Sequence, residues 1–551
     1  MQAVQAQVPT LVSRQPAANA VAAPGANPVV LGFSNPLLAN TAVRVVGNQY
    51  AGRRLGPLTV TGNTASLTPT PPFGPGELVR VSVPSTGAGV RPQVYEFRAA
   101  AGVAAATFGA RQTLAAYNLP TSVGTWDFDG DGDLDLAVSN AGTGGMSSTG
   151  RIYFYLNNGQ GVFTQTPNFI YAKLTDNVQA ADVDLDGDLD LMFLSFDDPR
   201  IGFYLNNGAG SFSASLTAIG GQYSVVAADF NGDGYPDLAS NEDATTLTVS
   251  LSNGTPPALA YASTRLTVGS SLWSPKVADL NGDGSLDLVV PNGQNPSMVH
   301  LLLNNGTGQF TPIAGIPMAE LTSEVATGDF DNDGRPDLLV SSLPPGGLYF
   351  CRNLGNGAFA PPVSVSSAPS LRLVPADFNG DGWLDVAASG RNATSNTVQI
   401  LLGNGAGQFT PSATLTASGS VYNLSVADLN GDRRLDVAVA IRANNTVELF
   451  YNQAAPLSAS TPSALAGLAL YPNPVTKGQL HLQLPPGFGT AGQPVSVELR
   501  NTVGQLVRTV SRLTTDSRSE AVVDVHALPS GLYTLQLTAG AEHIMRKVAI
   551  E

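Results

Sequence analysis

The sequence lacks several features that would place it in a common functional class. Its 551 residues include one cysteine, Cys351, which excludes an internal disulfide framework and a thiolate metal cluster. Lys and Arg number 27 against 42 Asp and Glu, so clustered basic residues for nucleic acid or anionic membranes are not expected. No apolar stretch approaches the ~18 residues of a membrane span, and no membrane span is expected.

Long runs of helix-forming residues at helical spacing are also absent. Glycine (59 residues) and proline (39 residues) are abundant, which is typical of many short strands joined by tight turns. We therefore expect an all-β chain, and its length predicts two to four domains. The first residues lack the basic end and apolar core of a signal peptide, so no signal peptide is visible in the given sequence. Cys351 lies in an apolar run and is expected to be a small core residue.

What the sequence does contain is a repeat of about fifty residues. Its most regular part is Asp-x-Asp/Asn-x-Asp-Gly-x-x-Asp followed by an apolar run. The first aspartates of the seven copies are Asp127, Asp182, Asp229, Asp279, Asp329, Asp377 and Asp428, at spacings of 55, 47, 50, 50, 48 and 51 residues. Near-equal spacing indicates one supersecondary unit repeated seven times.

Each repeat predicts four strands. One apolar strand precedes the aspartate loop, one follows it, a third ends in an Asn-Gly turn, and a fourth begins Gly-x-Phe, as at Phe163 and Phe310. Four strands per unit is the pattern of a propeller blade. The seventh unit has no fourth strand, and a matching orphan lies at residues 106–114. We expect this orphan to complete the last blade and close a seven-bladed β-propeller over about residues 104–453.

The loop spacing favours a hard cation, above all calcium, which takes six to eight oxygen ligands. Side chains at positions 1, 3, 5 and 9 can turn onto one centre, the carbonyl of position 7 adds an oxygen, and glycine at position 6 permits the turn. A lone copy can be an ordinary Asp-Gly turn, but seven in register are not. An EF-hand is excluded because position 12 is not glutamate, being Val138 in the first loop. Magnesium seldom uses an all-protein cage and is less favoured.

The candidate calcium ligands follow loop by loop. They are Asp127, Asp129, Asp131, Asp133 and Asp135; Asp182, Asp184, Asp186, Asp188 and Asp190; Asp229, Asn231, Asp233, Tyr235 and Asp237; Asp279, Asn281, Asp283, Ser285 and Asp287; Asp329, Asp331, Asp333, Arg335 and Asp337; Asp377, Asn379, Asp381, Trp383 and Asp385; and Asp428, Asn430, Asp432, Arg434 and Asp436.

These loops hold 26 of the 42 acidic residues, and carboxylates so close together repel one another unless a cation neutralises them. Up to seven calcium ions are therefore expected, and they would offset almost all of the net charge of −15. The seventh loop is doubtful, because Arg433 replaces the glycine and Arg434 follows it.

No catalytic constellation is discernible. The repeated region has one histidine, His300, in an apolar strand run, and its aspartates are committed to the loops. We therefore expect a non-catalytic adhesion, glycan-binding or protein-binding molecule. The alternative is a secreted polysaccharide-degrading enzyme, a lyase or hydrolase, on a calcium-stabilised propeller. Three aromatic residues six positions before a leading aspartate, Tyr223, Trp273 and Tyr422, are candidate ligand contacts on the face opposite the loops.

The aspartate loops and the Leu-Asn-Asn-Gly-x-Gly-x-Phe hairpins (156–163 and 303–310) resemble the FG-GAP/VCBS repeat of integrin α-chain propellers. The resemblance implies calcium loops between first and second strands on one face, with ligands on the other.

The C-terminal region resembles another known module. Leu470-Tyr-Pro-Asn-Pro-Val475, the run 501–506 and the final residues 546–551 are similar to the type A sorting domain of the type IX secretion system. That resemblance implies a partner in the secretion machinery and a place outside the cell or on the outer-membrane surface of a Gram-negative bacterium. Residues 8–99 are similar to bacterial Ig-like domains, implying a spacer. The predicted organisation is a tail (1–7), an Ig-like β-sandwich (8–99), the propeller (104–453), a linker (454–466) and a small β-sandwich sorting domain (467–551).

Overall fold

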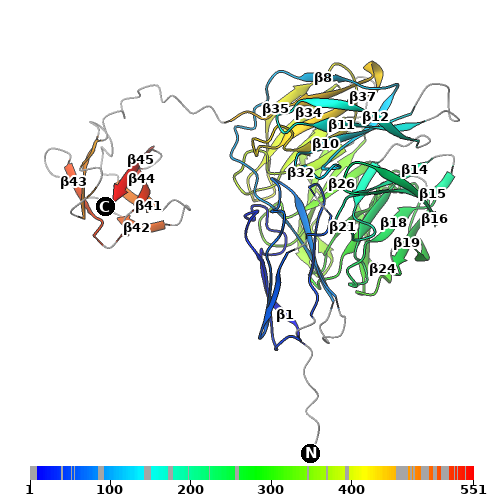
Figure 1. Ribbon diagram of the computed structural model, residues 1–551, viewed down its shortest axis with the longest axis horizontal. Coiled ribbons are helices and arrows are strands. Elements are labelled where there is room, and N and C mark those ends of the chain that lie inside the picture. Colours follow the sequence, from blue (N-terminus) through cyan, green and yellow to red (C-terminus); the bar gives the residue numbers. More distant parts are fainter. Residues whose placement is uncertain are drawn as a thin grey trace, which may run out of the picture. The chain divides into compact units, whose positions relative to one another are not determined.

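The computed structural model of the chain is all-β (Figure 1). It describes residues 9–38, 41–50, 52–54, 56–84, 92–141, 150–171, 178–195, 198–221, 224–254, 260–343, 346–367, 370, 372–390, 396–454, 469–471, 475, 478–484, 495–500, 506–510, 520–526, 528–529, 531–539 and 542–550. Within these ranges the sole helical element is a 3-10 turn, Arg442–Asn444, and nothing helical has the length and apolarity to cross a membrane. The predicted tail (1–7) and almost all of the predicted linker lie outside the described residues. The chain forms two compact units, 1–455 and 456–551.

The larger unit contains seven antiparallel sheets in succession, one for each aspartate loop, of which six have four strands and one has five. From the inner strand outward they are sheet 1, β9 (Pro120–Trp126), β10 (Asp135–Asn140), β11 (Arg151–Asn157) and β12 (Phe163–Tyr171); sheet 2, β13 (Val178–Ala181), β14 (Asp190–Ser195), β15 (Asp198–Asn206) and β16 (Phe212–Gly220); sheet 3, β17 (Val225–Ala228), β18 (Asp237–Asn241), β19 (Thr246–Ser252) and β20 (Tyr261–Thr267); sheet 4, β21 (Lys276–Ala278), β22 (Asp287–Pro291), β23 (Met298–Asn304) and β24 (Phe310–Pro312), with β25 (Ile316–Pro317) also on β23; sheet 5, β26 (Thr322–Gly328), β27 (Asp337–Ser342), β28 (Leu348–Cys351) and β31 (Val363–Ser366); sheet 6, β32 (Arg372–Ala376), β33 (Asp385–Ser389), β34 (Thr397–Gly403) and β35 (Phe409–Thr416); and sheet 7, β36 (Val421–Ala427), β37 (Asp436–Ile441), β38 (Thr446–Phe450) and β8 (Gln112–Ala115). A two-stranded hairpin, β29 (Asn353–Gly355) and β30 (Ala358–Phe359), follows β28.

The seven sheets form a closed ring. Each inner strand contacts the inner strand of the next sheet, and β36 of sheet 7 contacts β9 of sheet 1. The prediction for the orphan strand is confirmed, because β8 pairs with β38 from Ala115–Thr446 to Gln112–Leu449. A segment that precedes the first repeat thus completes the last sheet, and β38 is paired on both sides.

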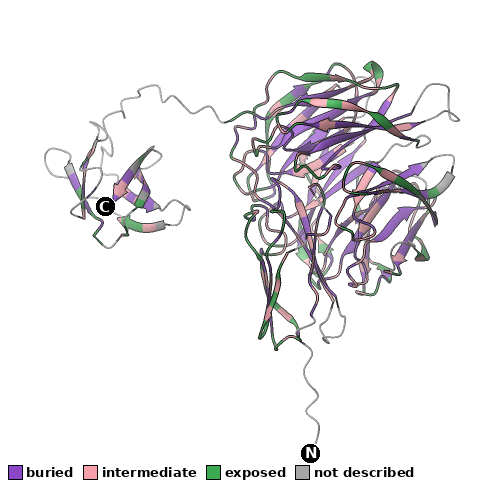
Figure 2. Cartoon of the chain, in the orientation of Figure 1, coloured by how far each residue is buried: buried purple, intermediate pink, exposed green. Residues whose placement is uncertain are grey.

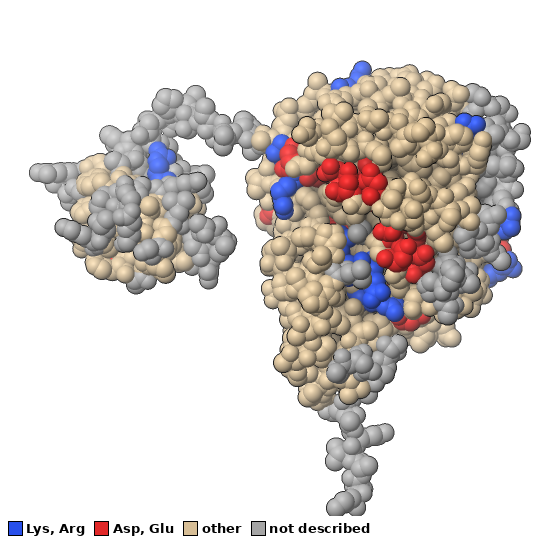
Figure 3. All heavy atoms as spheres, in the orientation of Figure 1, with Lys and Arg blue, Asp and Glu red and all other residues tan. Residues whose placement is uncertain are grey.

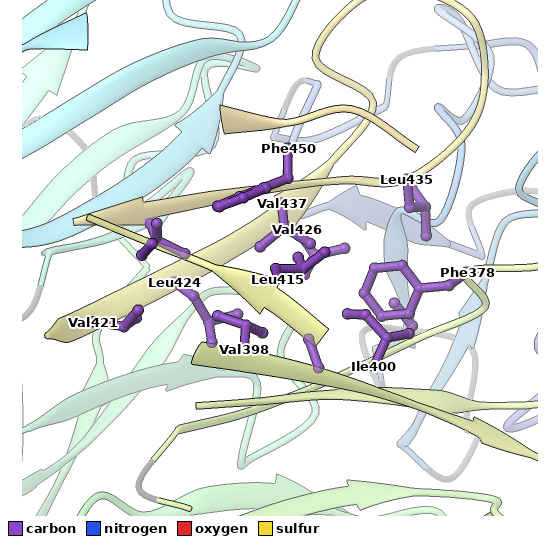
Figure 4. Packing of buried hydrophobic residues seen from close by; sticks show 14 of the residues in the cluster. Phe378, Val398, Ile400, Leu415, Val421, Leu424, Val426, Leu435, Val437 and Phe450 are labelled. Atoms are coloured by element: carbon purple, nitrogen blue, oxygen red, sulfur yellow. The ribbon is translucent and has the colours of Figure 1, made fainter. Parts of the chain in front are cut away.

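Apolar side chains pack between neighbouring sheets of the ring, and buried residues run along most of its strands (Figure 2). Figure 4 shows one such cluster, in which Phe378, Val398 and Ile400 of the sixth repeat meet Val421, Leu424 and Val437 of the seventh. Cys351 is fully buried in the cluster between sheets 4 and 5, as predicted, and burial raises the pKa of its thiol to about 12.

A second feature joins five of the seven sheets to a neighbour: a buried asparagine at the end of the third strand, which in three repeats begins an Asn-Asn-Gly turn, bridges two sheets. Asn304 Nδ2 donates to Phe230 O of loop 3 (2.7 Å) and to Leu286 O of its own loop (3.1 Å). Asn157 Nδ2 of sheet 1 donates to Leu429 O of the seventh loop (2.9 Å), so the same kind of bridge joins the first sheet to the last. The same bridge recurs at Asn206, Asn353 and Asn452.

Asn304→Ala is expected to destabilise the protein by about 2–4 kcal/mol, because it leaves two buried carbonyl groups without a donor. Urea unfolding in saturating calcium measures this loss. Asn305→Ala, at the exposed next position of the same turn, is the matched control and should cost little. Equal effects of the two substitutions would contradict the bridging role.

The N-terminal part of the larger unit is a two-sheet sandwich. One sheet has the order β1 (Leu11–Gln15), β2 (Val29–Phe33), β5 (Thr64–Leu67) and β4 (Leu58–Thr61), and the other β3 (Arg44–Gly47), β6 (Leu78–Val83) and β7 (Gln93–Arg98). The two enclose one core that contains Leu31, Phe33, Val81, Tyr95 and Phe97. Its strands are dark blue in Figure 1, beside the sheets of the ring.

The smaller unit also has two sheets. They have the orders β39 (Ala469–Tyr471), β40 (Gln479–Gln483) and β43 (Glu520–Asp524), and β42 (Leu506–Val510), β41 (Val495–Arg500), β44 (Gly531–Ala539) and β45 (Glu542–Ile550). Fifteen residues form their common core, Leu482 and Leu535 among them. Alternate residues of β40 and β43 face this core, which is the period-two pattern of a half-buried strand.

Candidate metal centres and the covered loop face

All seven aspartate loops join an inner strand to the second strand of its sheet, so they emerge at one end of the ring. The last aspartate of each loop starts the second strand and is fully buried: Asp135, Asp190, Asp237, Asp287, Asp337, Asp385 and Asp436. In each case Oδ2 accepts a hydrogen bond from the backbone N–H of position 2, and Oδ1 accepts one from the turn after the third strand. For Asp135 these donors are Phe128 N (3.1 Å) and Asn157 N (2.8 Å).

The first aspartate of each loop organises the turn. In loop 4, Asp279 Oδ1 accepts from Gly282 N (2.8 Å) and Oδ2 accepts from Gly284 N (2.9 Å). Glycine at position 6 has a positive φ, for example +86° at Gly284, which is why the sequence needs a residue without a Cβ there. Arg433 occupies the same position in loop 7 with a φ of +69°, and its N–H still reaches Asp428 Oδ2 (2.7 Å). The replacement of glycine therefore leaves the shape of the seventh loop unchanged.

Burial raises the pKa of these carboxyl groups, and hydrogen bonds from backbone N–H groups oppose it only in part. The pKa rises to about 8 for Asp135, Asp190 and Asp237, with burial the largest cause. In loop 2 burial raises the pKa of Asp182 to about 7. Buried carboxylates with raised pKa values need a positive partner to be stable as anions.

Three loops bring carboxylates together closely enough to hold a metal ion. The trios are Asp127, Asp129 and Asp135; Asp182, Asp184 and Asp190; and Asp329, Asp331 and Asp333, with the ligand atoms of each trio within 4.8 Å of one another. Asp182 is fully buried, and its Oδ1 has no hydrogen-bond partner in the described part of the chain. An unpaired buried carboxylate oxygen beside two more carboxylates fits a hard divalent cation.

The other loops differ at positions 3 and 5. In loops 3, 4 and 6 the asparagine amide turns onto the neighbouring carboxylate, as Asn231 Nδ2 does to Asp233 Oδ2 (3.0 Å). In loop 7 Arg434 donates from Nη2 to Asp432 Oδ2 and from Nε to Asn452 O (2.9 Å). Loop 5 has the same arrangement at Arg335, and Arg352 also pairs with Asp331 and Asp333. A guanidinium group thus lies on the position-5 carboxylate in two loops, which the sequence indicated only for the seventh.

Arg335→Ser and Arg434→Ser are each expected to raise the calcium affinity of their own loop about tenfold, because each removes a competing positive charge from the position-5 carboxylate. Loop 4 has serine at this position, so the side chain is compatible with the turn. Calorimetric titration of the chelated protein measures the change. Trp383→Ser at the same position of loop 6 is the uncharged control, and lower affinity in the arginine variants would contradict the competition.

The N-terminal sandwich covers this end of the ring and makes hydrogen bonds to loops 1 to 5, and residues 102–104, which follow the sandwich, make hydrogen bonds to loops 6 and 7. From loop 1 to loop 7, the bonds are Asp127 N to Gln49 O (2.9 Å), Gly52 N to Gly187 O (3.0 Å), Arg44 Nη1 to Asp233 O (2.9 Å), Val94 N to Gly284 O (2.8 Å), Asn19 Nδ2 to Gly334 O (3.0 Å), Ala104 N to Asn379 O (3.0 Å) and Gly102 N to Arg433 O (2.6 Å).

Close packing accompanies these bonds. Arg53 N donates to Asp182 Oδ2 (2.7 Å), and a Cβ on the preceding Gly52 would lie 2.1 Å from Asp182 Cβ. Val94 packs in the cluster between sheets 3 and 4, Val21 in the one between sheets 5 and 6, and Tyr50 against the one between sheets 1 and 7. The expected spacer is therefore a cap on the loops. No pattern in the sequence predicted this, because the contacts join short segments far apart in the chain.

The aromatic candidates are placed as follows. Trp273 is half-buried and lies just before β21. Its backbone N–H donates to Pro291 O (2.9 Å), whereas its indole Nε1 is buried without a partner in the described part of the chain. Tyr422 is half-buried in β36, with the Arg442 guanidinium carbon 5.3 Å from its ring centroid. Both belong to the ends of inner strands away from the loops. Tyr223 lies outside the described residues. Burial lowers the pKa of His300, and its Nε2 has no partner in the described part of the chain.

On the face of the larger unit that Figure 3 shows, Asp and Glu side chains form patches with Lys and Arg beside them. Residues 469–551 match the secretion system C-terminal sorting domain, the sorting domain of type IX secretion, so the protein is a secreted or cell-surface protein. Among curated proteins, none matches the chain.

Two solved structures resemble the chain at low identity. One concerns the specific recognition of non-reducing terminal N-acetylglucosamine by an Agrocybe aegerita lectin (19% identity, 75% of this chain and 96% of that chain, TM-score 0.42). The other is BBS1N in complex with ARL6DN, soaked with lead (8% identity, 65% of this chain and 99% of that chain, TM-score 0.44).

The family model that matches the ring is the FG-GAP-like repeat. Its six overlapping matches cover residues 127–193, 182–240, 229–290, 279–340, 329–388 and 377–439. Each match begins at the first aspartate of a loop and extends into the second strand of the following repeat. Together they span more than half of the sequence, and the chain therefore belongs to the FG-GAP-like repeat family.

Proposed function

We propose that this secreted protein is a calcium-stabilised, seven-bladed β-propeller that binds an extracellular glycan or protein without catalysing a reaction. Calcium is the favoured ion because the loops offer only oxygen donors, clustered around buried carboxylates, and exported proteins meet millimolar calcium. The proposed ligands are the loop residues predicted from the sequence, with the fifth and seventh sites weakened by arginine.

The observation that carries this proposal is the cap on the loop face. Loops 1 to 5 make hydrogen bonds to the N-terminal sandwich, and loops 6 and 7 make them to residues 102–104 that follow it, so the loops are engaged within the chain and are not free to receive a ligand. The metal ions would then have a structural role: they neutralise buried carboxylates and fix the surface on which the sandwich docks. Ligand recognition is left to the opposite face, where the inner strands begin.

Trp273 and Tyr422 are the proposed ligand contacts on that face. Both are half-buried aromatic residues at the start of an inner strand, and aromatic rings in such places stack on sugars and on apolar side chains. The partner of the smaller unit is proposed to be the secretion machinery of a Gram-negative bacterium, and the domain limits are proposed to be 8–99, 104–453 and 467–551.

A glycan array followed by a product assay on every hit tests the proposal. We expect binding without turnover, and we expect the double variant Trp273→Ala/Tyr422→Ala to lose binding while its melting temperature is retained. Trp383→Ala removes an aromatic residue on the loop side and is the matched control. Full binding by the double variant would remove these contacts from the proposal, and release of a cleaved product would replace the binding function with a polysaccharide-degrading one.

A further inference from the structure

The centre of the ring, beneath the sandwich, contains a cavity of about 270 Å³. The sandwich supplies Asn48, Gln49 and Arg98 to its lining, while β9, β32 and β36 supply the opposite walls. The sandwich covers the loop-side end of the ring, and the inner strands begin at the opposite end. The cavity is large enough for a single sugar ring, which is larger than a free carboxylate or phosphate.

The free hydrogen-bonding groups of this cavity are mainly donors. Asn48 Oδ1 accepts from Leu78 N (3.0 Å) and Asn423 Oδ1 accepts from Val123 N (3.3 Å), so both amides have used their acceptor atoms on the walls. In the described part of the chain, neither Nδ2 has a hydrogen-bond partner, and each presents two N–H donors. Gln49 is oriented the other way: its Nε2 donates to Val426 O (3.0 Å), leaving Oε1 as an acceptor.

Among the described residues that line the cavity, Arg98 is the one cationic residue and none is a carboxylate. No hydrogen bond or ion pair joins its guanidinium group to a described residue, whereas the nearby Arg80 is paired with Glu96 and with Ala227 O. Burial lowers the pKa of Arg98, which Glu96 opposes from a distance. An unpaired, half-buried guanidinium group gains most from an anion that it can bind in a bidentate manner. A cavity with such a group and no acid is unexpected in a chain whose net charge is −15.

We infer that this axial cavity binds the carboxylate of an acidic sugar, with Arg98 as its anchor and Asn48 and Asn423 as further donors. The hydroxyl group of Ser122 and the acceptor Oε1 of Gln49 are suited to the sugar hydroxyls, and the Trp126 ring forms an apolar wall. The Thr125 and Ser425 hydroxyl groups bond to each other (2.8 Å). This inference deepens the proposed binding function and rests on it, because it names the ligand class and the part of the channel that recognises it.

Calorimetry of the full chain in saturating calcium tests the inference, with glucuronate, galacturonate and their oligosaccharides as probes and with glucose, galactose and acetate as comparisons. We expect the acidic sugars to bind and the neutral sugars and acetate to bind at least about 30-fold more weakly. Arg98→Gln keeps hydrogen-bond donors and removes the charge, and it should weaken binding of acidic sugars by a similar factor.

Asn423→Asp is the second variant, in case Arg98→Gln disturbs folding. It keeps the acceptor for Val123 N but places a negative charge in the cavity, so it should also lose binding, with its melting curve as the check on folding. Arg14→Gln changes an arginine of the sandwich that lies over the Tyr95 ring, outside the cavity lining, and should bind like the unaltered protein.

Glycan binding that is equal in the unaltered protein and both cavity variants, or restricted to neutral sugars, would overturn the inference while leaving the proposed binding function in place. Acetate binding as tight as that of the acidic sugars would also overturn it, since the cavity would then be a site for small anions. No binding of any glycan would overturn both the inference and the glycan part of the proposed function.

Discussion

Excess EDTA is expected to lower the melting temperature of the protein by roughly 10–20 °C at pH 8. With a dissociation constant of ~0.1 mM and ~2 mM calcium, each occupied loop contributes about 1.8 kcal/mol of linkage free energy. Several such loops rival the ~5–15 kcal/mol stability of a typical domain. Differential scanning calorimetry in calcium, and in EDTA at the same ionic strength, measures the difference.

The pH dependence of the metal-free protein distinguishes calcium loss from general destabilisation. Burial raises the pKa of Asp135, Asp190 and Asp436 to about 8, far above the value of about 3.9 in an unfolded chain. Between these values the folded state binds more protons than the unfolded state, so stability falls as pH rises and is regained on acidification. In EDTA the melting temperature should therefore increase from pH 8 to pH 5. In the calcium sample, protons compete with calcium for the carboxylates. The difference in melting temperature between the calcium and EDTA samples should therefore become smaller from pH 8 to pH 5.

A melting temperature in EDTA that equals the value in calcium across this pH range would contradict the role given to the loops. Magnesium at the same concentration is the matched control for ionic effects, and it should restore little of the lost stability because it demands an octahedral shell and keeps its waters.

Calcium removal is also expected to release the sandwich from the ring before the ring itself unfolds. The backbone N–H groups of Gly52, Arg53, Val94 and Gly102 donate to acceptors in loops 2, 4 and 7. When carboxylate repulsion distorts a metal-free loop, these acceptors move and the amides become exposed to solvent. Hydrogen exchange in EDTA should speed up at least about tenfold at these amides.

Strand β2 of the sandwich provides the comparison. Leu31 is fully buried in β2, which pairs with β1 and β5 and does not depend on the loops, so its amide should stay protected. Linkage is reciprocal, and Arg44→Ala, which removes the bond to Asp233 O, should weaken calcium binding at loop 3. If hydrogen exchange at the amides of Gly52, Arg53, Val94 and Gly102 is unchanged in EDTA, the contact between the sandwich and the loops does not depend on metal binding.

Much of the ring follows from the sequence because its determinants are local. The fifty-residue spacing, the Asn-Gly turns and the orphan strand before Asp127 predict the sheet order, and the pairing of β8 with β38 confirms the predicted exchange of the first strand into the last sheet. The aspartate positions likewise predict which side chains approach one another in loops 1 and 2, since a tight turn brings positions 1, 3 and 9 together.

Other features depend on contacts that no local pattern encodes. The sequence pattern assigned no role to the asparagine at the end of the third strand, yet Asn157, Asn304 and their equivalents join neighbouring sheets. The repetition of that asparagine in five repeats was the available signal. The cap on the loops is different, since Gly52 and Val94 fit the loops through backbone groups that any sequence possesses. Arg98 gives no sequence signal either, because only the fold places it in a cavity without acids.

The metal content of the purified protein tests the central claim most directly. Native mass spectrometry after dialysis against millimolar calcium should find about five to seven calcium ions per chain, with the weakest lost first on dilution. Asp182→Asn/Asp190→Asn, which neutralises two ligands of loop 2, should reduce the count by one. A chain that retains fewer than about one ion, or a count that this variant leaves unchanged, would contradict the assignment of the loops as calcium sites.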